Sequence, residues 1–176
     1  MIMNNRQTTI TLGISSCLLG EQVRYDGNHQ FYPELIRKLQ DLFELKSFCP
    51  EVNAGLGVPR PAIQLFKSDQ GIFCAEVEHP EKDVTRLLTA SFAEKADDFT
   101  HLSGFVLKTK SPSCGLSGVK QFSQLGLYRN GRGLFAEFIR QNYPDMPVTD
   151  EISLNDGHCF ERFVRQVVCY SEKQSV

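Results

Sequence analysis

Three of the six cysteines occur in short motifs that combine a thiol with glycine, proline or serine. Cys17, Cys49 and Cys114 stand in the segments SSCLLG, FCPEV and SPSCG. Glycine lets backbone N–H groups approach a bound anion closely, and proline holds a loop in one shape. Thiolates in such loops suit iron–sulfur centres, because the sulfur atoms of these centres accept hydrogen bonds. These three cysteines are therefore candidate metal ligands.

Short apolar strands separated by amphipathic helices would position the three cysteines. The predicted strands cover residues 9–15, 43–48 and 104–108. The predicted helices cover residues 33–42, 83–102, a segment from 134 that ends before Pro144, and 156–170. This alternation is typical of an α/β domain, so we expect a three-layer, Rossmann-like fold with a mainly parallel sheet.

Each candidate cysteine follows one of the predicted strands. In a parallel sheet the carboxyl ends of the strands lie at one edge, where open α/β sheets bind ligands. Three cysteines that are far apart in the sequence can therefore meet there. Residues 63–67 and 72–77 flank the turn-forming tetrapeptide SDQG and predict a small β-hairpin inserted into the alternation.

Composition limits the class of protein. The 176-residue chain has 19 Lys and Arg against 21 Asp and Glu, and this charge does not favour binding to duplex nucleic acid. Its length predicts one domain over residues 1–176, with an ordered core over about 9–171. Since no segment has the pattern of a signal peptide or membrane helix, we expect a cytoplasmic protein with reduced cysteines. The sequence leaves the oligomeric state open.

The remaining cysteines have weaker indications of function. Cys74 lies in an apolar strand and Cys159 shares a helix face with apolar residues, so both are expected to pack in the core. Cys169 lies off that face and is expected to be partly exposed. Zinc is the alternative metal, but structural zinc sites usually bring ligands in close pairs such as C-x2-C. Since the chain has no such pair, a cluster held by three thiolates is favoured.

Three ordered motifs extend across most of the chain. They are SSCLLG with VRYDG, then CPEVNAGLGVPR, and then KTKSPSCG. Together they resemble the TudS-type thiouracil desulfidase family in its single-domain form, with similarity from about residue 14 to residue 170. The resemblance implies a 4Fe-4S cluster held by Cys17, Cys49 and Cys114, in which one iron has no protein ligand.

The resemblance also implies a reaction and its residues. A thiouracil-type base or 4-thiouridine monophosphate would be converted to the oxo form with release of sulfide. The catalytic carboxylate falls on Glu51 and the catalytic hydroxyl on Ser111, with Ser113 as the competing candidate. A structural role is the alternative in each case, because Glu51 can cap the turn after Cys49 and Ser111 can form a turn before Pro112.

Four residues are candidates for substrate binding: Arg24, Asp26, Lys110 and Ser113. Arg24 and Asp26 can also form a structural ion pair with each other. Lys110, like Lys108, follows the third predicted strand and can bind a nucleotide phosphate or stay solvated. The segment GRG at 131–133 offers a further anion site at the start of a predicted helix.

Two other functions remain open from the sequence. A redox or sulfur carrier would hold the cluster without turnover, although electron carriers generally saturate their irons with four cysteines. A metal-free thiol enzyme would use Cys17 or Cys49 as nucleophile. It would need a nearby His or Lys to lower the pKa of that thiol.

Overall fold

Four parallel strands form the centre of the fold in the computed structural model, which describes residues 9–174. We call this sheet A. Its strands lie in the order β2 (Glu44–Phe48), β1 (Thr11–Ser15), β5 (Phe105–Leu107) and β8 (Val148–Asp150). Because all three pairings are parallel, the carboxyl ends of the four strands lie at one edge, as the sequence predicts.

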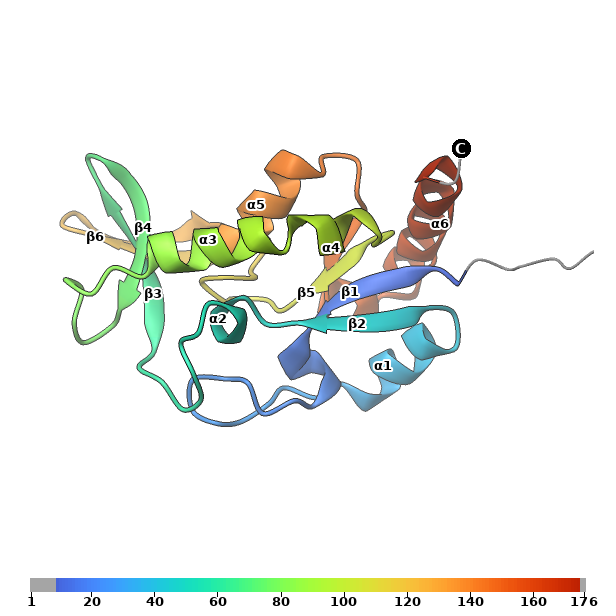
Figure 1. Ribbon diagram of the computed structural model, residues 1–176, viewed down its shortest axis with the longest axis horizontal. Coiled ribbons are helices and arrows are strands. Elements are labelled where there is room, and N and C mark those ends of the chain that lie inside the picture. Colours follow the sequence, from blue (N-terminus) through green and yellow to red (C-terminus); the bar gives the residue numbers. More distant parts are fainter. Residues whose placement is uncertain (1–8, 175–176) are drawn as a thin grey trace, which may run out of the picture.

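Helices cover both faces of sheet A (Figure 1). One face packs against α3 (Thr85–Glu94), α4 (Ala96–Thr100) and α5 (Leu134–Asn142). The other packs against α1 (Pro33–Gln40) and α6 (Gly157–Gln174). Alternate residues of β5 serve the two sides, because Phe105 and Leu107 pack in the first core and Val106 in the second. This arrangement confirms the expected three-layer α/β class.

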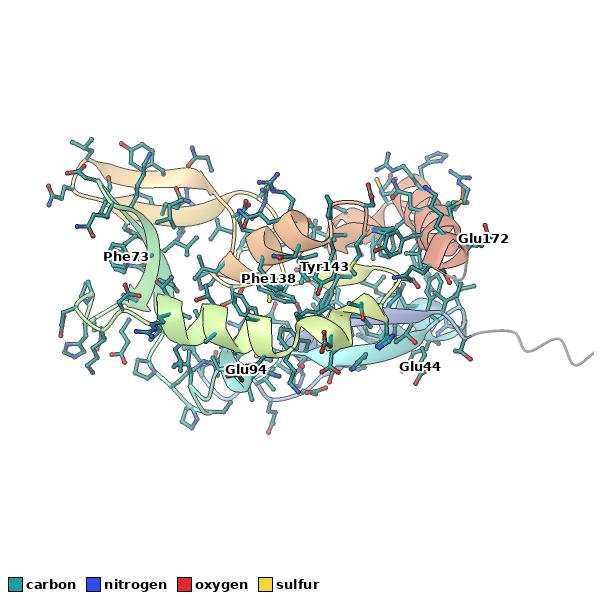
Figure 2. The ribbon with its side chains drawn as sticks, turned by 45° about the horizontal axis from the view of Figure 1, so that its top comes forward. Glu44, Phe73, Glu94, Phe138, Tyr143 and Glu172 are labelled. Atoms are coloured by element: carbon teal, nitrogen blue, oxygen red, sulfur yellow. The ribbon has the colours of Figure 1, made fainter. Side chains whose placement is uncertain are left out.

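The core between sheet A and α3–α5 is rich in aromatic rings. Phe48, Phe99 and Phe135 contact one another with ring centroids 4.7 to 5.4 Å apart. Phe138 and Tyr143 continue the cluster toward the surface (Figure 2). Each buried ring stabilises the fold by about 1.5–3 kcal/mol through the apolar area that it removes from water.

Gly13 makes room for this aromatic core in the middle of β1. A Cβ atom built on Gly13 would lie 2.3 Å from Cε2 of Phe105 on the neighbouring strand. The position therefore requires glycine, and the ring of Phe105 fills the space that a side chain would occupy.

A second four-stranded sheet, sheet B, lies at the carboxyl-end side of sheet A (Figure 1). Its order is β4 (Gly71–Glu76), β3 (Ile63–Ser68), β6 (Val119–Ser123) and β7 (Gly126–Gly131). The predicted hairpin forms β3 and β4. Strands β6 and β7 were not expected. Strand β6 pairs in parallel with β3 and antiparallel with β7, so the two strands enlarge the hairpin into a sheet.

The long helix predicted over residues 83–102 is divided at Lys95. Lys95 has φ −100° and ψ 6°, and its N–H donates to Phe92 in a tighter turn than an α-helix has. The hydroxyl of Tyr143 donates to the carbonyl of Ala96 at 2.7 Å, which binds the junction to the end of α5. Asp97 and Asp98 then lie in the first turn of α4, where acidic residues are favourable.

Three short helical segments complete the described chain. They are η1 (Ser16–Leu19), α2 (Pro50–Asn53) and η2 (Ser153–Asn155). Within residues 9–174, no helix combines the length and the apolar composition that crossing a membrane requires.

Candidate active site

A cavity of about 530 Å³ lies at the carboxyl edge of sheet A, and Cys17, Cys49 and Cys114 all line it. Cys17 lies in η1 immediately after β1, and Cys49 follows the last residue of β2. Cys114 lies in the loop that connects β5 to β6. Parallel pairing of the three strands therefore brings together three motifs that are far apart in the sequence, as expected from the strand-end positions.

Local contacts hold the loops that contain Cys49 and Cys114 in place. Cys49 occupies the N-cap position of α2, and its Sγ lies 4.0 Å from the Val23 carbonyl oxygen. The Ser111 hydroxyl accepts hydrogen bonds from the N–H groups of Ser113 and Cys114 at 3.1 and 3.0 Å. This turn holds Cys114, whose side chain is buried in the cavity wall.

The N-terminus of α5 binds the backbone of the Cys114 loop. The N–H of Leu134 donates to Pro112 O at 3.0 Å, and the N–H of Phe135 donates to Ser113 O at 2.9 Å. At the N-cap, a Cβ atom on Gly133 would lie 2.3 Å from Ser113 O. Because carbonyl groups of the chain already occupy this helix end, the anion site suggested by the GRG segment is not formed there.

Burial dominates the electrostatics of the three thiols. It raises the pKa of Cys17 to about 11, with Cys49 adding to the rise and Lys108 and Arg24 opposing it. Burial likewise raises the pKa of Cys49, and it raises that of Cys114 well above its usual range. The three groups therefore favour the neutral thiol in the free protein, and a positive centre among them would stabilise the thiolates.

The three thiols line one cavity without closing on a point. Among the described residues, no three His, Cys, Asp or Glu side chains are placed to hold a metal ion. No disulfide links the described cysteines, all of which are free. Cys74 is fully buried and Cys169 exposed, as predicted, whereas Cys159 is only half-buried and accepts a hydrogen bond from Arg162.

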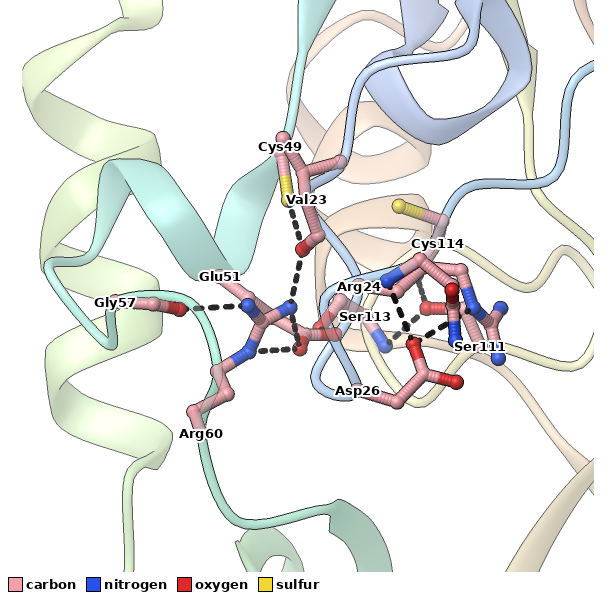
Figure 3. A network of polar contacts seen from close by, with 11 residues as sticks. Val23, Arg24, Asp26, Cys49, Glu51, Gly57, Arg60, Ser111, Ser113 and Cys114 are labelled. Atoms are coloured by element: carbon pink, nitrogen blue, oxygen red, sulfur yellow. Dashed lines mark hydrogen bonds and ion pairs between the residues drawn. The ribbon is translucent and has the colours of Figure 1, made fainter.

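Glu51 points into the same region and is held from two sides (Figure 3). Arg60 donates from Nε and Nη2 to Oε2 of Glu51, at 2.9 and 2.7 Å. Ser113 Oγ donates to Oε1 at 3.0 Å. The remaining donors of Arg60 bind the carbonyl oxygens of Val23 and Gly57, so this one buried guanidinium joins three segments around the cavity.

The two candidate serines have different places. Ser111 lines the cavity, whereas Ser113 is fully buried and does not. Ser113 contacts Glu51, and Ser111 contacts the backbone of its own loop. The geometry therefore separates a hydroxyl that faces the cavity from one that holds the carboxylate.

The candidate substrate-binding residues are also divided. Arg24 and Lys110 line the cavity, and Lys110 has a left-handed backbone with φ 61°. Asp26 is exposed and lies outside the cavity lining, with Oδ1 at 3.6 Å from Nε of Arg24. This contact agrees with the ion-pair alternative for Arg24 and Asp26.

Arg60 and Glu151 are site residues that the sequence did not predict. Arg60 was visible only as the last residue of the CPEVNAGLGVPR motif. Glu151 follows β8, which is too short for a clear strand pattern. Its carboxylate accepts hydrogen bonds from Lys108 Nζ at 2.5 Å and from Thr109 Oγ1 at 2.6 Å.

The fold and the cavity define a class of small α/β protein that gathers cysteine thiols and a carboxylate at the carboxyl edge of a parallel sheet. Residues 12–151 match the model of the 2-thiouracil desulfurase family, so the chain belongs to that family. This membership confirms the resemblance found in the three sequence motifs.

Two relatives extend this result. The uncharacterized protein YbbK of Bacillus subtilis (strain 168) is 31% identical over 153 residues, which cover 81% of this chain and 97% of YbbK. A solved structure of the 4Fe-4S-dependent thiouracil desulfidase TudS is 27% identical, with a TM-score of 0.62. That match covers 84% of this chain and 94% of the TudS chain.

Proposed function

We propose that this protein is an iron–sulfur-dependent desulfidase that converts thiouracil-type bases or 4-thiouridine monophosphate to the oxo form and releases sulfide. The observation that carries the proposal is one cavity lined by three cysteines of different strand-end loops, with a doubly held carboxylate beside them. Family membership and the likeness to TudS support the same reaction.

The donor set fits a 4Fe-4S cluster. Three thiols come from separate loops, which suits a centre in which each cysteine binds a different iron atom. Cys17, Cys49 and Cys114 would hold it. When bound, an iron without a protein ligand supplies a Lewis acid for the soft sulfur of the substrate, which makes sulfide a better leaving group.

Glu51 is proposed as the general base. In the overall reaction water adds its oxygen to the ring carbon, the carbon–sulfur bond breaks, and the sulfur leaves as sulfide. Each carboxylate oxygen has more than one lone pair, so Glu51 can accept a proton from water while it remains bonded to Arg60 and Ser113. Proton removal by a positioned carboxylate accelerates such steps by about 10²–10⁴-fold.

The neighbouring polar residues orient the substrate in this proposal. Ser111 faces the cavity and accepts two N–H groups through its oxygen, which leaves its own proton to donate to the substrate. Arg24 and Lys110 add positive charge to the cavity wall, which suits a nucleotide phosphate. Ser113 holds Glu51, and Asp26 holds Arg24 from outside the cavity.

A thiouracil assay tests this function after the protein has been reconstituted with iron and sulfide under oxygen-free conditions. We expect consumption of the thiolated base with release of one sulfide for each oxo base formed. Glu51→Gln should lower kcat by about 10²–10⁴-fold while the iron content stays at the wild-type level. Glu94→Gln, at an exposed position of α3, is the control.

Two results would count against the proposal. Full activity of Glu51→Gln would remove the general base from the mechanism. A cluster-loaded protein that acts on neither the free bases nor the nucleotide would favour the alternative, a cluster carrier without turnover.

A further inference from the structure

A fully buried carboxylate, Glu151, stands outside the machinery described above. It has no exposed surface, and three donors satisfy it. Lys108 Nζ and Thr109 Oγ1 donate to Oε1, and the N–H of Thr109 donates to Oε2 at 2.9 Å. Lys108 and Glu151 directly follow the paired ends of β5 and β8, so the sheet itself sets their positions.

Stability alone is a weak explanation for this buried ion pair. Removing two charges from water costs several kcal/mol for each ion, and apolar replacements of such pairs are often neutral or stabilising. The cost is therefore better explained by a requirement to place one of the two charges.

The two members of the ion pair differ in their position relative to the cavity. Lys108 lines the cavity that Cys17, Cys49 and Cys114 also line, whereas Glu151 does not. The positive member of the pair thus belongs to the cavity wall, where its charge opposes the rise in the pKa of Cys17, and the negative member is fully buried. The Lys108 side chain is 13% exposed, so water screens its charge less than it screens that of the exposed Lys110.

Arg60, another cation of the cavity wall, has a different kind of partner. Arg60 binds Glu51, which lines the cavity itself, so that pair brings both signs of charge to the wall. Lys108 is also tied to β1, because its N–H donates to Ser15 Oγ at 3.0 Å. Its backbone is thus tied to the end of β1, while its ammonium is held by the residue that follows β8.

We propose that Glu151 is a positioning residue that holds the Lys108 ammonium against the cysteine-lined cavity, where its charge stabilises the anionic iron–sulfur centre. The inference rests on the proposed function, because it needs that centre in the cavity. Three thiolates give the centre a negative charge, and a nearby fixed cation favours its more reduced forms and retards its loss.

The matched test removes both charges at once. Lys108→Met with Glu151→Gln leaves no unpaired buried charge, and Lys82→Met with Glu76→Gln removes a surface ion pair of the same residue types as control. After anaerobic reconstitution, the first double variant should lose iron to a chelator about 10- to 100-fold faster than wild type. Its cluster reduction potential should shift to more negative values, while the control double variant behaves as wild type.

Conservative variants separate placement from folding. Lys108→Arg keeps the charge and should keep the wild-type potential. Glu151→Gln alone removes the group that positions the Lys108 ammonium, so it should lose iron to the chelator faster than wild type, with near-normal circular dichroism. Wild-type potential and wild-type iron retention in the Lys108→Met, Glu151→Gln double variant would overturn the inference and leave the proposed function intact. Failure of the wild-type protein itself to take up iron would overturn both.

Discussion

Among single residues, Arg60 controls the geometry of the carboxylate on which the proposed chemistry depends. Its side chain is 3% exposed, and it binds Glu51 through Nε and Nη2. Nη2 also donates to the Val23 carbonyl, and Nη1 donates to the Gly57 carbonyl. The planar guanidinium fixes the carboxylate plane, which a lysine ammonium cannot do. Arg60 therefore acts through Glu51 as a positioning residue.

Arg60→Lys tests this role. We expect kcat to fall about 10- to 100-fold with little change in KM, since the positive charge stays but the carboxylate loses its orientation. Steady-state kinetics on protein of matched iron content would measure this split, with Arg86→Lys on the exposed face of α3 as control. A wild-type kcat for Arg60→Lys would show that the carboxylate orients without the guanidinium.

The sequence predicted the residues that stand at strand ends, and missed those defined by contacts between distant segments. Cys17, Cys49 and Cys114 follow recognisable apolar strands, so their meeting in one cavity could be anticipated. Arg60 is significant only because Glu51 and Val23 lie within reach in the folded chain. No local pattern encodes that proximity.

At the scale of elements, α5 serves as a clamp for the Cys114 loop. Its first N–H groups bind carbonyl oxygens of Pro112 and Ser113, and Gly133 allows the two backbones to touch. The same contacts satisfy the free donors of a helix N-terminus. A change at this junction should therefore affect both the stability of the fold and the position of Cys114.

Gly133→Ala is expected to lower the free energy of unfolding by about 1–3 kcal/mol, because its Cβ would overlap the Ser113 carbonyl. Urea denaturation measures this loss, and iron uptake should fall with it. Gly157→Ala is the control, since a Cβ atom there meets nothing within 4 Å. Equal stability of the two variants would contradict the clamp.

Ion pairs of Glu137 with Arg140 on α5 and with Arg132 just before it make a pH-dependent contribution to the free energy of unfolding. Hydrogen bonds from Arg140 and Arg132 lower the pKa of Glu137 from 4.5 to about 2. Its contribution is then complete above about pH 4.5 and is lost as the pH falls toward 2. Because the carboxylate is 32% exposed, we expect about 1 kcal/mol after solvent screening.

Urea unfolding of Glu137→Gln across pH checks this linkage. The variant should be less stable than wild type by about 1 kcal/mol at pH 7, and the difference should vanish near pH 2. Glu161→Gln on exposed α6 should show neither effect. A difference that stays constant with pH would indicate a packing effect rather than a charge effect.

Helices and strands with a strong apolar periodicity could be predicted from the sequence, whereas short or exposed strands could not. Strands β1, β2 and β5 and helices α1, α5 and α6 were all anticipated. Strand β7 is exposed over nearly its whole length and β8 has three residues, so neither shows an apolar pattern. Tertiary contact at Ala96 divides the helix that the 83–102 pattern presents as continuous.

At the scale of the whole molecule, both sheets contribute residues to the cavity wall. Loops at the carboxyl edge of sheet A supply the thiols, Glu51 and Lys108, and sheet B supplies a wall that includes Gln64 and Phe122. The molecule is long because sheet B extends beyond the core, with Phe73 at the far end from Glu172 (Figure 2). The cavity wall thus includes residues from both sheets.

Iron counting after anaerobic reconstitution tests the central claim most directly. The account predicts about four iron atoms per chain in the wild type and a loss of stable iron in Cys17→Ser, Cys49→Ser and Cys114→Ser. Cys159→Ser and Cys169→Ser, on the half-buried and exposed positions of α6, should retain the full amount. Full iron retention in any of the first three variants, or no iron in the wild type, would contradict the account.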